Sequence, residues 1–317
     1  MRHAAPSAPL ALLLLLAGCG GASEPQAEPL AGTSARETAE AAPRMSWPDL
    51  LQRERPAADG TLDFEDGGVA ADYWIPAGDG PHPVVLMIHG GCWQKAIADR
   101  TLMDWAAADL RDRGIAVWNI EYLGVDEPEG AYPVIFQSVR SAASLVRTKA
   151  DELDLDLGRM VAFGHSAGGH LALWLAANDN LPEGSPIGSG SVVGLAGVVN
   201  TGGLPDLAES EPVTLPSCLA DVREALTGPP SGDRPDPYAD TSPDRMLPLG
   251  IPQVSIAGAD DPISPPLLAE RWTAEARAAG DEARTVIVPG GHVELIAPGT
   301  EAWEETVRQI EALLAAG

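Results

Sequence analysis

Short apolar runs alternate with helix-like segments along most of this chain, and this alternation constrains its fold more than any other feature. Strands that are regularly separated by helices indicate a mostly parallel sheet covered by helices on both faces. We therefore expect one α/β domain over residues 59–317, with the irregular, Pro/Gly-rich stretch 200–248 as a cap-like insertion over the C-terminal edge of the sheet. The pattern predicts strands at 62–64, 70–75, 83–88, 115–120, 161–163, 192–199, 252–257 and 284–288, and helices at 97–113, 133–149, 217–227, 264–279 and 302–315.

One of the predicted strand-to-helix junctions carries the sequence GHSAG, at residues 164–168. A serine in a G-x-S-x-G turn between a strand and a helix can be a nucleophile held at the edge of a sheet. Because the chain has 34 glycines in 317 residues, the motif alone is weak. Ser166 is a candidate nucleophile only if the partners that it needs are present elsewhere.

A serine nucleophile needs an imidazole to take its proton and a carboxylate to orient that imidazole. In hydrolases of the G-x-S-x-G type the chain order is serine, acid, histidine. Of the six histidines, only His292 lies downstream of Ser166 at a distance, in a Pro-Gly-Gly-His loop after a predicted strand; the others are His3, His82, His89, His165 and His170. His292 is the candidate base, and the alternative is a surface histidine on a glycine-rich turn.

The acid is expected after the strand at 252–257, where two aspartates are adjacent. A carboxylate aimed at His292 should lie a few residues beyond the strand end, in a loop that Pro262 and Pro265 stiffen. We favour Asp261, and Asp260 is the alternative, with the unused aspartate in a solvated or capping role.

The negative oxygen that forms when a hydroxyl attacks a carbonyl needs two or more N–H donors. One is expected from Ala167, which follows the candidate nucleophile, and the others from a loop after an earlier strand. The sequence HGGCW at 89–93 fits that loop, because paired glycines let backbone N–H groups approach a ligand. Gly91 and Cys92 are the candidate donors, and a plain tight turn is the alternative.

The N-terminus reads as an export signal. An apolar core at 10–17 is too short for an ordinary membrane span, and it ends in LAGC at 16–19, which resembles a bacterial lipobox. We expect a signal peptide at 1–18, lipid attachment at Cys19 and a flexible tether at 19–58 along which Trp47, Leu50 and Leu51 begin to dock onto the domain. This organisation predicts a lipid-anchored protein of the cell envelope, and Gly20 after the cysteine favours the outer membrane by resemblance to lipoprotein sorting rules. An ordinary secretory signal with an incidental cysteine is the alternative.

Export also bears on the remaining cysteines. Without Cys19, the chain has two, Cys92 and Cys218. In an oxidising compartment they can form a disulfide that closes a long loop, or they can be two buried thiols.

Net charge and motif content exclude several kinds of partner. The formal net charge is −26, which argues against nucleic-acid binding and disfavours strongly anionic substrates. No histidine pair has the spacing of metal ligands on a helix, and the acidic stretches lack a calcium-loop pattern. We expect no metal and no cofactor.

Over about residues 62–315, the chain resembles the α/β-hydrolase family, and within it the esterase branch that bears HGG-x-W and GHSAGGHLA. This branch includes kynurenine formamidase-like and feruloyl-esterase-like proteins, and the catalytic half is similar to prolyl-oligopeptidase-type peptidases. The stretch NIEY at 119–122 and the pattern Gly258-x-x-Asp261-x-x-x-Pro265 belong to the same resemblance, which places the acid on Asp261. It also implies a disulfide between Cys92 and Cys218, since similar proteins carry cysteines at both positions.

The sequence thus predicts a serine hydrolase that cleaves small, neutral carboxylic esters through an acyl-enzyme intermediate. An amide hydrolase with the same three residues is the enzymatic alternative. A catalytically silent surface-binding protein on the same scaffold is the alternative from another class.

Overall fold

Eight strands form the central sheet of the computed structural model, which describes residues 44–65, 68–216 and 218–317. The strand order is β1-β2-β4-β3-β5-β6-β7-β8, with β1 and β2 antiparallel to their neighbours and all other pairs parallel. The strands are β1 (Gly60–Asp63), β2 (Val69–Trp74), β3 (His82–Ile88), β4 (Ala116–Ile120), β5 (Leu155–His165), β6 (Gly197–Thr201), β7 (Gln253–Gly258) and β8 (Ala283–Val288). The mostly parallel sheet expected from the sequence is confirmed.

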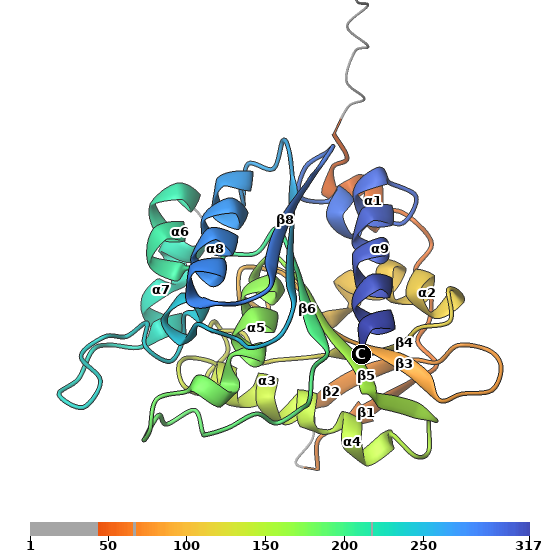
Figure 1. Ribbon diagram of the computed structural model, residues 1–317, viewed down its shortest axis with the longest axis horizontal. Helices are drawn as coiled ribbons and strands as arrows, with labels where there is room; N and C mark the ends of the chain where they lie inside the picture. The colour runs from red at the N-terminus through yellow and green to blue at the C-terminus, as the bar shows by residue number, and fades with distance from the viewer. Residues whose placement is uncertain (1–43, 66–67, 217) are drawn as a thin grey trace, which may run out of the picture. The chain divides into compact units, whose positions relative to one another are not determined.

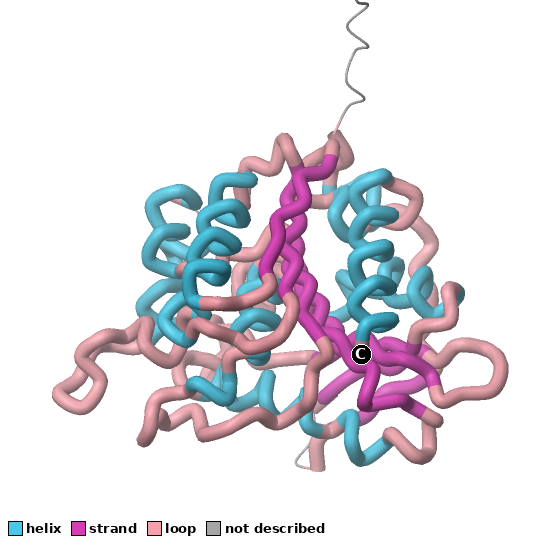
Figure 2. Tube along the Cα trace, in the orientation of Figure 1, coloured by secondary structure: helices cyan, strands magenta, loops and turns pink. Residues whose placement is uncertain are grey.

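Helices cover both faces of this sheet (Figures 1 and 2). The helices are α1 (Trp47–Leu51), α2 (Asp104–Asp112), α3 (Val134–Ser144), α4 (Val146–Lys149), α5 (Ala167–Ala176), α6 (Leu207–Thr214), α7 (Leu219–Thr227), α8 (Pro266–Ala279) and α9 (Glu301–Ala316). Alternate residues of β3 enter different cores: Val84 and Leu86 belong to the core that includes residues of α3, α5, α7 and α8, whereas Val85 and Met87 belong to the core that includes residues of α1, α2 and α9. Burial on both faces explains why the inner strands read as continuous apolar runs.

Several elements differ from the sequence-based expectation; β5, for example, begins at Leu155 rather than at residue 161, and the helix expected at 133–149 divides into α3 and α4. The helix expected at 97–113 begins only with a 3-10 turn at Arg100–Met103, because the Asp99 carboxylate accepts the N–H of Thr101 (2.9 Å) and caps that turn. The strand expected at 192–199 is shorter and later, at Gly197–Thr201, where it pairs with β5. The insertion at 200–248 contains a second helix, α6, which the internal Pro212 concealed in the sequence.

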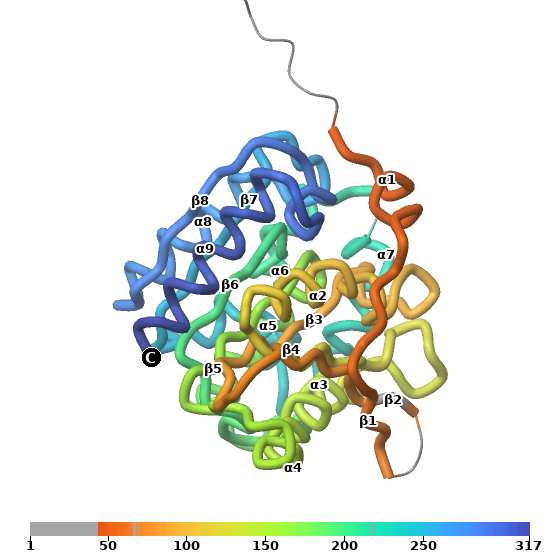
Figure 3. The backbone as a smooth tube through the Cα atoms, turned by 90° about the vertical axis from the view of Figure 1, so that its right-hand side faces the viewer, coloured from red at the N-terminus to blue at the C-terminus, as the bar shows by residue number. Residues whose placement is uncertain are grey.

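The tether boundary also moves. Residues Pro43–Gly317 form one compact unit, and Figure 3 shows α1 and the chain after it running along that unit to β1. Residues 44–58 are therefore part of the folded domain rather than of a flexible tether, because Leu50 is fully buried in the core. The expected signal peptide, the lipid attachment at Cys19 and the remainder of the tether lie outside the described residues. Among the described helices, none combines the length and the apolar character needed to cross a membrane.

Candidate active site

Ser166 lies at the sharp turn between β5 and α5, where its backbone has φ 56° and ψ −123°. Left-handed φ values are costly for residues with a side chain, and they persist where the surrounding structure enforces them. The flanking glycines permit this turn: a Cβ on Gly164 would lie 2.0 Å from the Gly168 carbonyl oxygen, and a Cβ on Gly168 would lie 2.1 Å from that of Ile88. The geometry matches the nucleophile turn expected from the motif.

His292 and Asp261 form a buried pair at the ends of β8 and β7. His292 Nδ1 lies 2.6 Å from Asp261 Oδ2, and the other carboxylate oxygen accepts the N–H groups of Ile263 (2.8 Å) and Ser264 (3.0 Å). Asp260, by contrast, is exposed. Because three contacts fix the carboxylate, it holds the imidazole ring in one orientation and leaves Nε2 available for another partner.

Ser166 and His292 line the same cavity, which has a volume of about 470 Å³. The neighbouring His165 strengthens this proximity, since its Nε2–H donates to the His292 carbonyl oxygen (3.0 Å). Burial lowers the pKa of His165 well below its usual value, so it stays neutral beside His292. Within the described part of the chain, no hydrogen bond joins the Ser166 hydroxyl to His292. Such bonds often become short only when substrate is bound.

The HGG loop (residues 89–93) follows β3 and brings its backbone to the same sheet edge. Gly91, Cys92 and Trp93 all have positive φ, at 114°, 51° and 57°. Successive residues in this region turn the chain so that backbone N–H groups can converge on one point. The N–H groups of Gly91 and Cys92 have no acceptor among the described residues, and neither has that of Ala167, the first residue of α5. All three remain free to bind a ligand oxygen.

Side-chain contacts join the HGG loop to α5 and to the insertion at 200–248. Cys92 and Cys218 form a disulfide, so the pairing that the resemblance implied is confirmed. The bridge spans 126 residues, and closing a loop of that size stabilises a protein by about 2–5 kcal/mol. Trp93 Nε1–H donates to His170 Nδ1 (3.1 Å), whose Nε2–H donates to Thr241 O (2.8 Å). Burial lowers the pKa of His170 to about 4, which keeps this ring neutral and able to accept.

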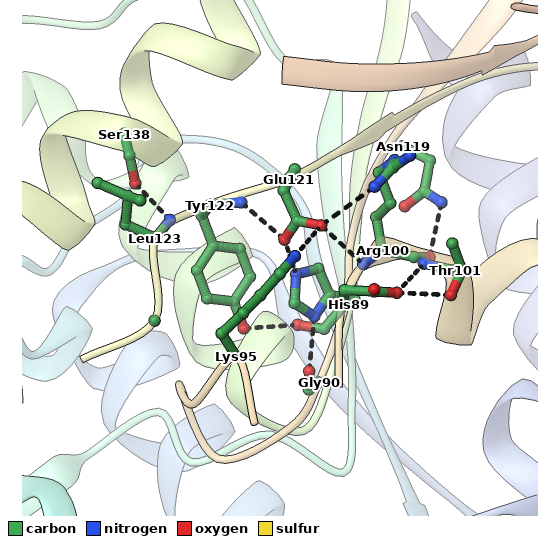
Figure 4. Close-up of polar contacts among 12 residues, drawn as sticks. His89, Gly90, Lys95, Arg100, Thr101, Asn119, Glu121, Tyr122, Leu123 and Ser138 are labelled. Carbon is green, nitrogen blue, oxygen red and sulfur yellow. Dashed lines mark hydrogen bonds and ion pairs between the residues drawn. The ribbon is translucent and has the colours of Figure 1, made fainter. Parts of the chain in front are cut away.

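A polar cluster around Glu121 fixes the loop from the other side (Figure 4). One Glu121 carboxylate oxygen lies 2.9 Å from His89 Nε2, and the other lies 2.6 Å from Lys95 Nζ and 3.4 Å from Arg100 Nη1. The Tyr122 ring stacks on the His89 ring, and its hydroxyl donates to the His89 carbonyl oxygen (3.1 Å). Burial by itself would raise the pKa of Glu121, but the hydrogen bond and charge of His89 and the Lys95 ammonium outweigh it and bring the pKa to about 2.

This depressed pKa predicts how Glu121 contributes to stability at different pH. The folded-state pKa is about 2 and the ordinary value is 4.5, so the contribution is complete above about pH 4.5 and is lost as the pH falls toward 2. We expect Glu121→Gln to be less stable than the parent protein at pH 7, by on the order of 3 kcal/mol. The difference in stability between Glu121→Gln and the parent protein should decrease steadily below pH 4.5, as measured by urea denaturation midpoints.

The exposed Glu129 provides the control for this measurement. Glu129→Gln should have the same urea denaturation midpoint as the parent protein at every pH. A gap between Glu121→Gln and the parent that stayed constant down to pH 2 would contradict the role assigned to the Glu121 charge.

The N-terminal segment (residues 44–55), rather than the expected cap, forms part of the cavity wall. Of the described residues in the insertion 200–248, none lines the cavity. The N-terminal segment supplies three of the lining residues instead, and loop 94–102 supplies others. The complete lining is Trp47, Leu51, Arg55, Gly91, Cys92, Lys95, Ile97, Ala98, Asp99, Thr101, Leu102, His165, Ser166, Ile263 and His292. The described residues of the insertion therefore do not cap this cavity. They pack against α5 and α8, and they contact the residues around the site through the Cys218 disulfide and through backbone groups such as Thr201 O, which accepts the N–H of Ser166 (2.9 Å).

A sequence signal for the N-terminal segment existed. Ser46 is followed three residues later by Asp49, whose carboxylate accepts the Ser46 N–H (2.7 Å), and Pro48 occupies the first turn. This is the pattern of a helix start, and an apolar pair, Leu50 and Leu51, follows it. The pattern predicts a short helix, but nothing in it says which surface the helix covers.

Residues 72–269, well over half of the chain, match the family model described as BD-FAE. The match includes Ser166 and Asp261 and ends before His292. A comparison with curated protein sequences gave no match.

Several solved structures have a similar fold. A truncated carbohydrate esterase from gut microbiota is 20% identical, with a TM-score of 0.69 over 83% of this chain and 100% of the other. A bacterial heroin esterase is 22% identical, with a TM-score of 0.63 over 81% of this chain and 82% of the other. A thermophilic esterase from the planctomycete Thermogutta terrifontis is 20% identical, with a TM-score of 0.64 over 82% and 92%. At these identities the likeness concerns the fold.

Proposed function

This chain belongs to the BD-FAE family and has the α/β-hydrolase fold, and from these premises we propose that it is a serine hydrolase of carboxylic esters. Ser166 is the nucleophile, His292 the general base and acid, and Asp261 the residue that orients His292. The backbone N–H groups of Gly91, Cys92 and Ala167 form the oxyanion hole.

The reaction proceeds in two steps. Ser166 Oγ attacks the ester carbonyl carbon while its proton passes to His292 Nε2, and the three N–H groups hold the resulting oxyanion. When the tetrahedral species collapses, the C–O bond to the alcohol breaks, and the alcohol leaves with the proton from His292. A water molecule then attacks the acyl-enzyme through the same proton transfers, which releases the acid and restores Ser166.

The observation that carries this proposal is the buried contact of 2.6 Å between His292 and Asp261, at the rim of the cavity that Ser166 also lines. A buried carboxylate on Nδ1 fixes the ring so that Nε2 can serve as the base, and it stabilises the imidazolium that forms. The strained backbone turn at Ser166 supports its role as the nucleophile. The three N–H groups without an acceptor among the described residues support the oxyanion hole.

The lining of the cavity suits a neutral ester. Apolar side chains, among them Trp47, Leu51 and Leu102, supply much of its described lining. The similar solved structures are described as esterases, of carbohydrates in one case and of heroin in another.

A fluorophosphonate probe tests the proposal, because it forms a covalent bond with an activated serine. We expect one probe per chain, mapped by peptide mass spectrometry to Ser166, together with hydrolysis of p-nitrophenyl butyrate. The corresponding anilide should react at least about 100-fold more slowly. Faster cleavage of the anilide would overturn the ester assignment, and absence of both labelling and turnover would indicate a binding protein.

A further inference from the structure

The N-terminal segment is attached to the loops that carry the proposed acid and base. Arg44 Nη1 donates to the carbonyl oxygen of Asp260 (2.9 Å), in the acid loop. The N–H of Met45 donates to Glu294 Oε1 (2.5 Å), and the other Glu294 oxygen accepts the N–H of Gly291 (3.0 Å), in the base loop. Glu294 thereby joins the segment to the residue directly before the proposed base.

The other end of the segment is fixed as well. Leu50 is fully buried among the residues of α2 and α9. Arg53 Nη1 donates to the carbonyl oxygen of Pro298 (2.8 Å), and Trp105 Nε1 donates to that of Glu54 (2.9 Å). Contacts at both ends make this segment a rigid wall of the cavity.

The wall presents apolar side chains to the cavity. Leu51 of the segment is 46% exposed, and Ile97 of loop 94–102 is 57% exposed. Both line the cavity together with Trp47 and Leu102. Large apolar side chains that stay exposed around a concave site beside reactive groups are typical of a surface that binds an apolar part of a ligand.

The position of Trp47 indicates which part of an ester lies there. Its indole ring is edge-on to the rings of His292 and His165, with ring centres 6.2 Å and 6.1 Å apart. The departing alcohol oxygen must receive its proton from His292, so the alcohol part of the substrate lies beside that ring. Because Trp47 and His292 line the same cavity, an alcohol group that lies beside the His292 ring in that cavity is within reach of Trp47.

We propose that the N-terminal segment forms the alcohol-binding wall of the active site, with Trp47 and Leu51 in contact with an apolar alcohol group of the substrate. This inference rests on the proposed function and deepens it: the preferred substrates are esters of apolar alcohols with several carbon atoms. Trp47 is a specificity-determining residue for the first step alone, because the acyl-enzyme no longer holds the alcohol.

Acetate esters of increasing alcohol length test this inference in the full-length protein, since all of them give the same acetyl-enzyme. For Trp47→Ala we expect kcat/KM on hexyl acetate to fall about tenfold more than on methyl acetate, mainly through KM, because each contact with a CH₂ group contributes to binding. Trp47→Phe should restore most of the selectivity. The ratio between p-nitrophenyl hexanoate and p-nitrophenyl acetate should stay as in the parent protein.

Leu51→Ala should shift the alcohol preference in the same direction, and Leu267→Ala is its matched control, because Leu267 is also 46% exposed but does not line the cavity. An equal loss by Trp47→Ala on all acetates would overturn the inference, since it would show that Trp47 only positions His292. A loss that followed acyl length would overturn it too. A parent protein that hydrolysed no ester would instead refute the proposed function itself.

Discussion

Ser166→Ala is expected to lower kcat for p-nitrophenyl butyrate by about 10⁴-fold or more, the range seen when the nucleophile of a serine hydrolase is removed. The proposed oxyanion donors and the cavity remain in the variant, so a small residual rate should persist. The left-handed backbone at residue 166 is imposed by its surroundings, and alanine adds no atom that serine lacks. The fold should therefore be retained, as checked by circular dichroism and the thermal midpoint.

A buried serine away from the cavity provides the matched control. Ser210 in α6 is fully buried, and its hydroxyl has no partner among the described residues. Ser210→Ala should keep near-parental turnover and fluorophosphonate labelling, whereas Ser166→Ala should lose both. Turnover by Ser166→Ala at a rate close to the parent would refute the assigned nucleophile.

The second large effect is expected at the acid. Asp261→Asn should reduce kcat by about 10³–10⁴-fold, because an amide cannot stabilise the imidazolium and can hold the ring in the wrong tautomer. The loss should appear in kcat more than in KM, since Asp261 is not among the described residues that line the cavity. The measurement is steady-state hydrolysis of p-nitrophenyl butyrate at pH 8.

The adjacent aspartate makes this test unusually direct. Asp260→Asn removes the same charge one residue earlier, but the side chain of Asp260 is exposed. Its hydrogen bonds to other described residues are made by the backbone: the N–H donates to Gly290 O (3.0 Å), and the carbonyl oxygen accepts from Arg44. We expect its activity to stay within about twofold of the parent, as for most surface substitutions. Equal losses in the two variants would show that the net charge of the loop matters rather than the contact with His292.

The parts of the site that follow from chain order were predictable. Each of the candidate residues comes directly after a strand: the HGG loop after β3, Ser166 after β5, Asp261 after β7 and His292 after β8. Parallel strands end at one sheet edge, so a sequence pattern that locates strands also locates the residues that can meet there. For the same reason, the alternation of apolar and helical segments predicted most of the fold.

The parts that depend on packing between distant segments were not predictable. The polar composition around Ser46 and Asp49 resembles the chain before it, so residues 44–58 read as a tether although they pack into the core. The stretch 200–248 was predicted to be a cap because it is irregular and Pro/Gly-rich and follows a strand at the edge where open α/β sheets bind ligands. Which surface a short helix covers is decided by long-range contacts such as Arg44 with Asp260, and such contacts leave no local pattern.

The disulfide between Cys92 and Cys218 has a consequence for how this protein can change over evolution. It links the insertion covalently to the HGG loop, whose N–H groups we propose as oxyanion donors. Under this proposal, substitutions in α7 that shift Cys218 will change the reaction rate, whereas substitutions in the N-terminal segment will change the selectivity. Rate and selectivity can thus change independently, because they depend on α7 and on the N-terminal segment, which lie about 170 residues apart in the chain.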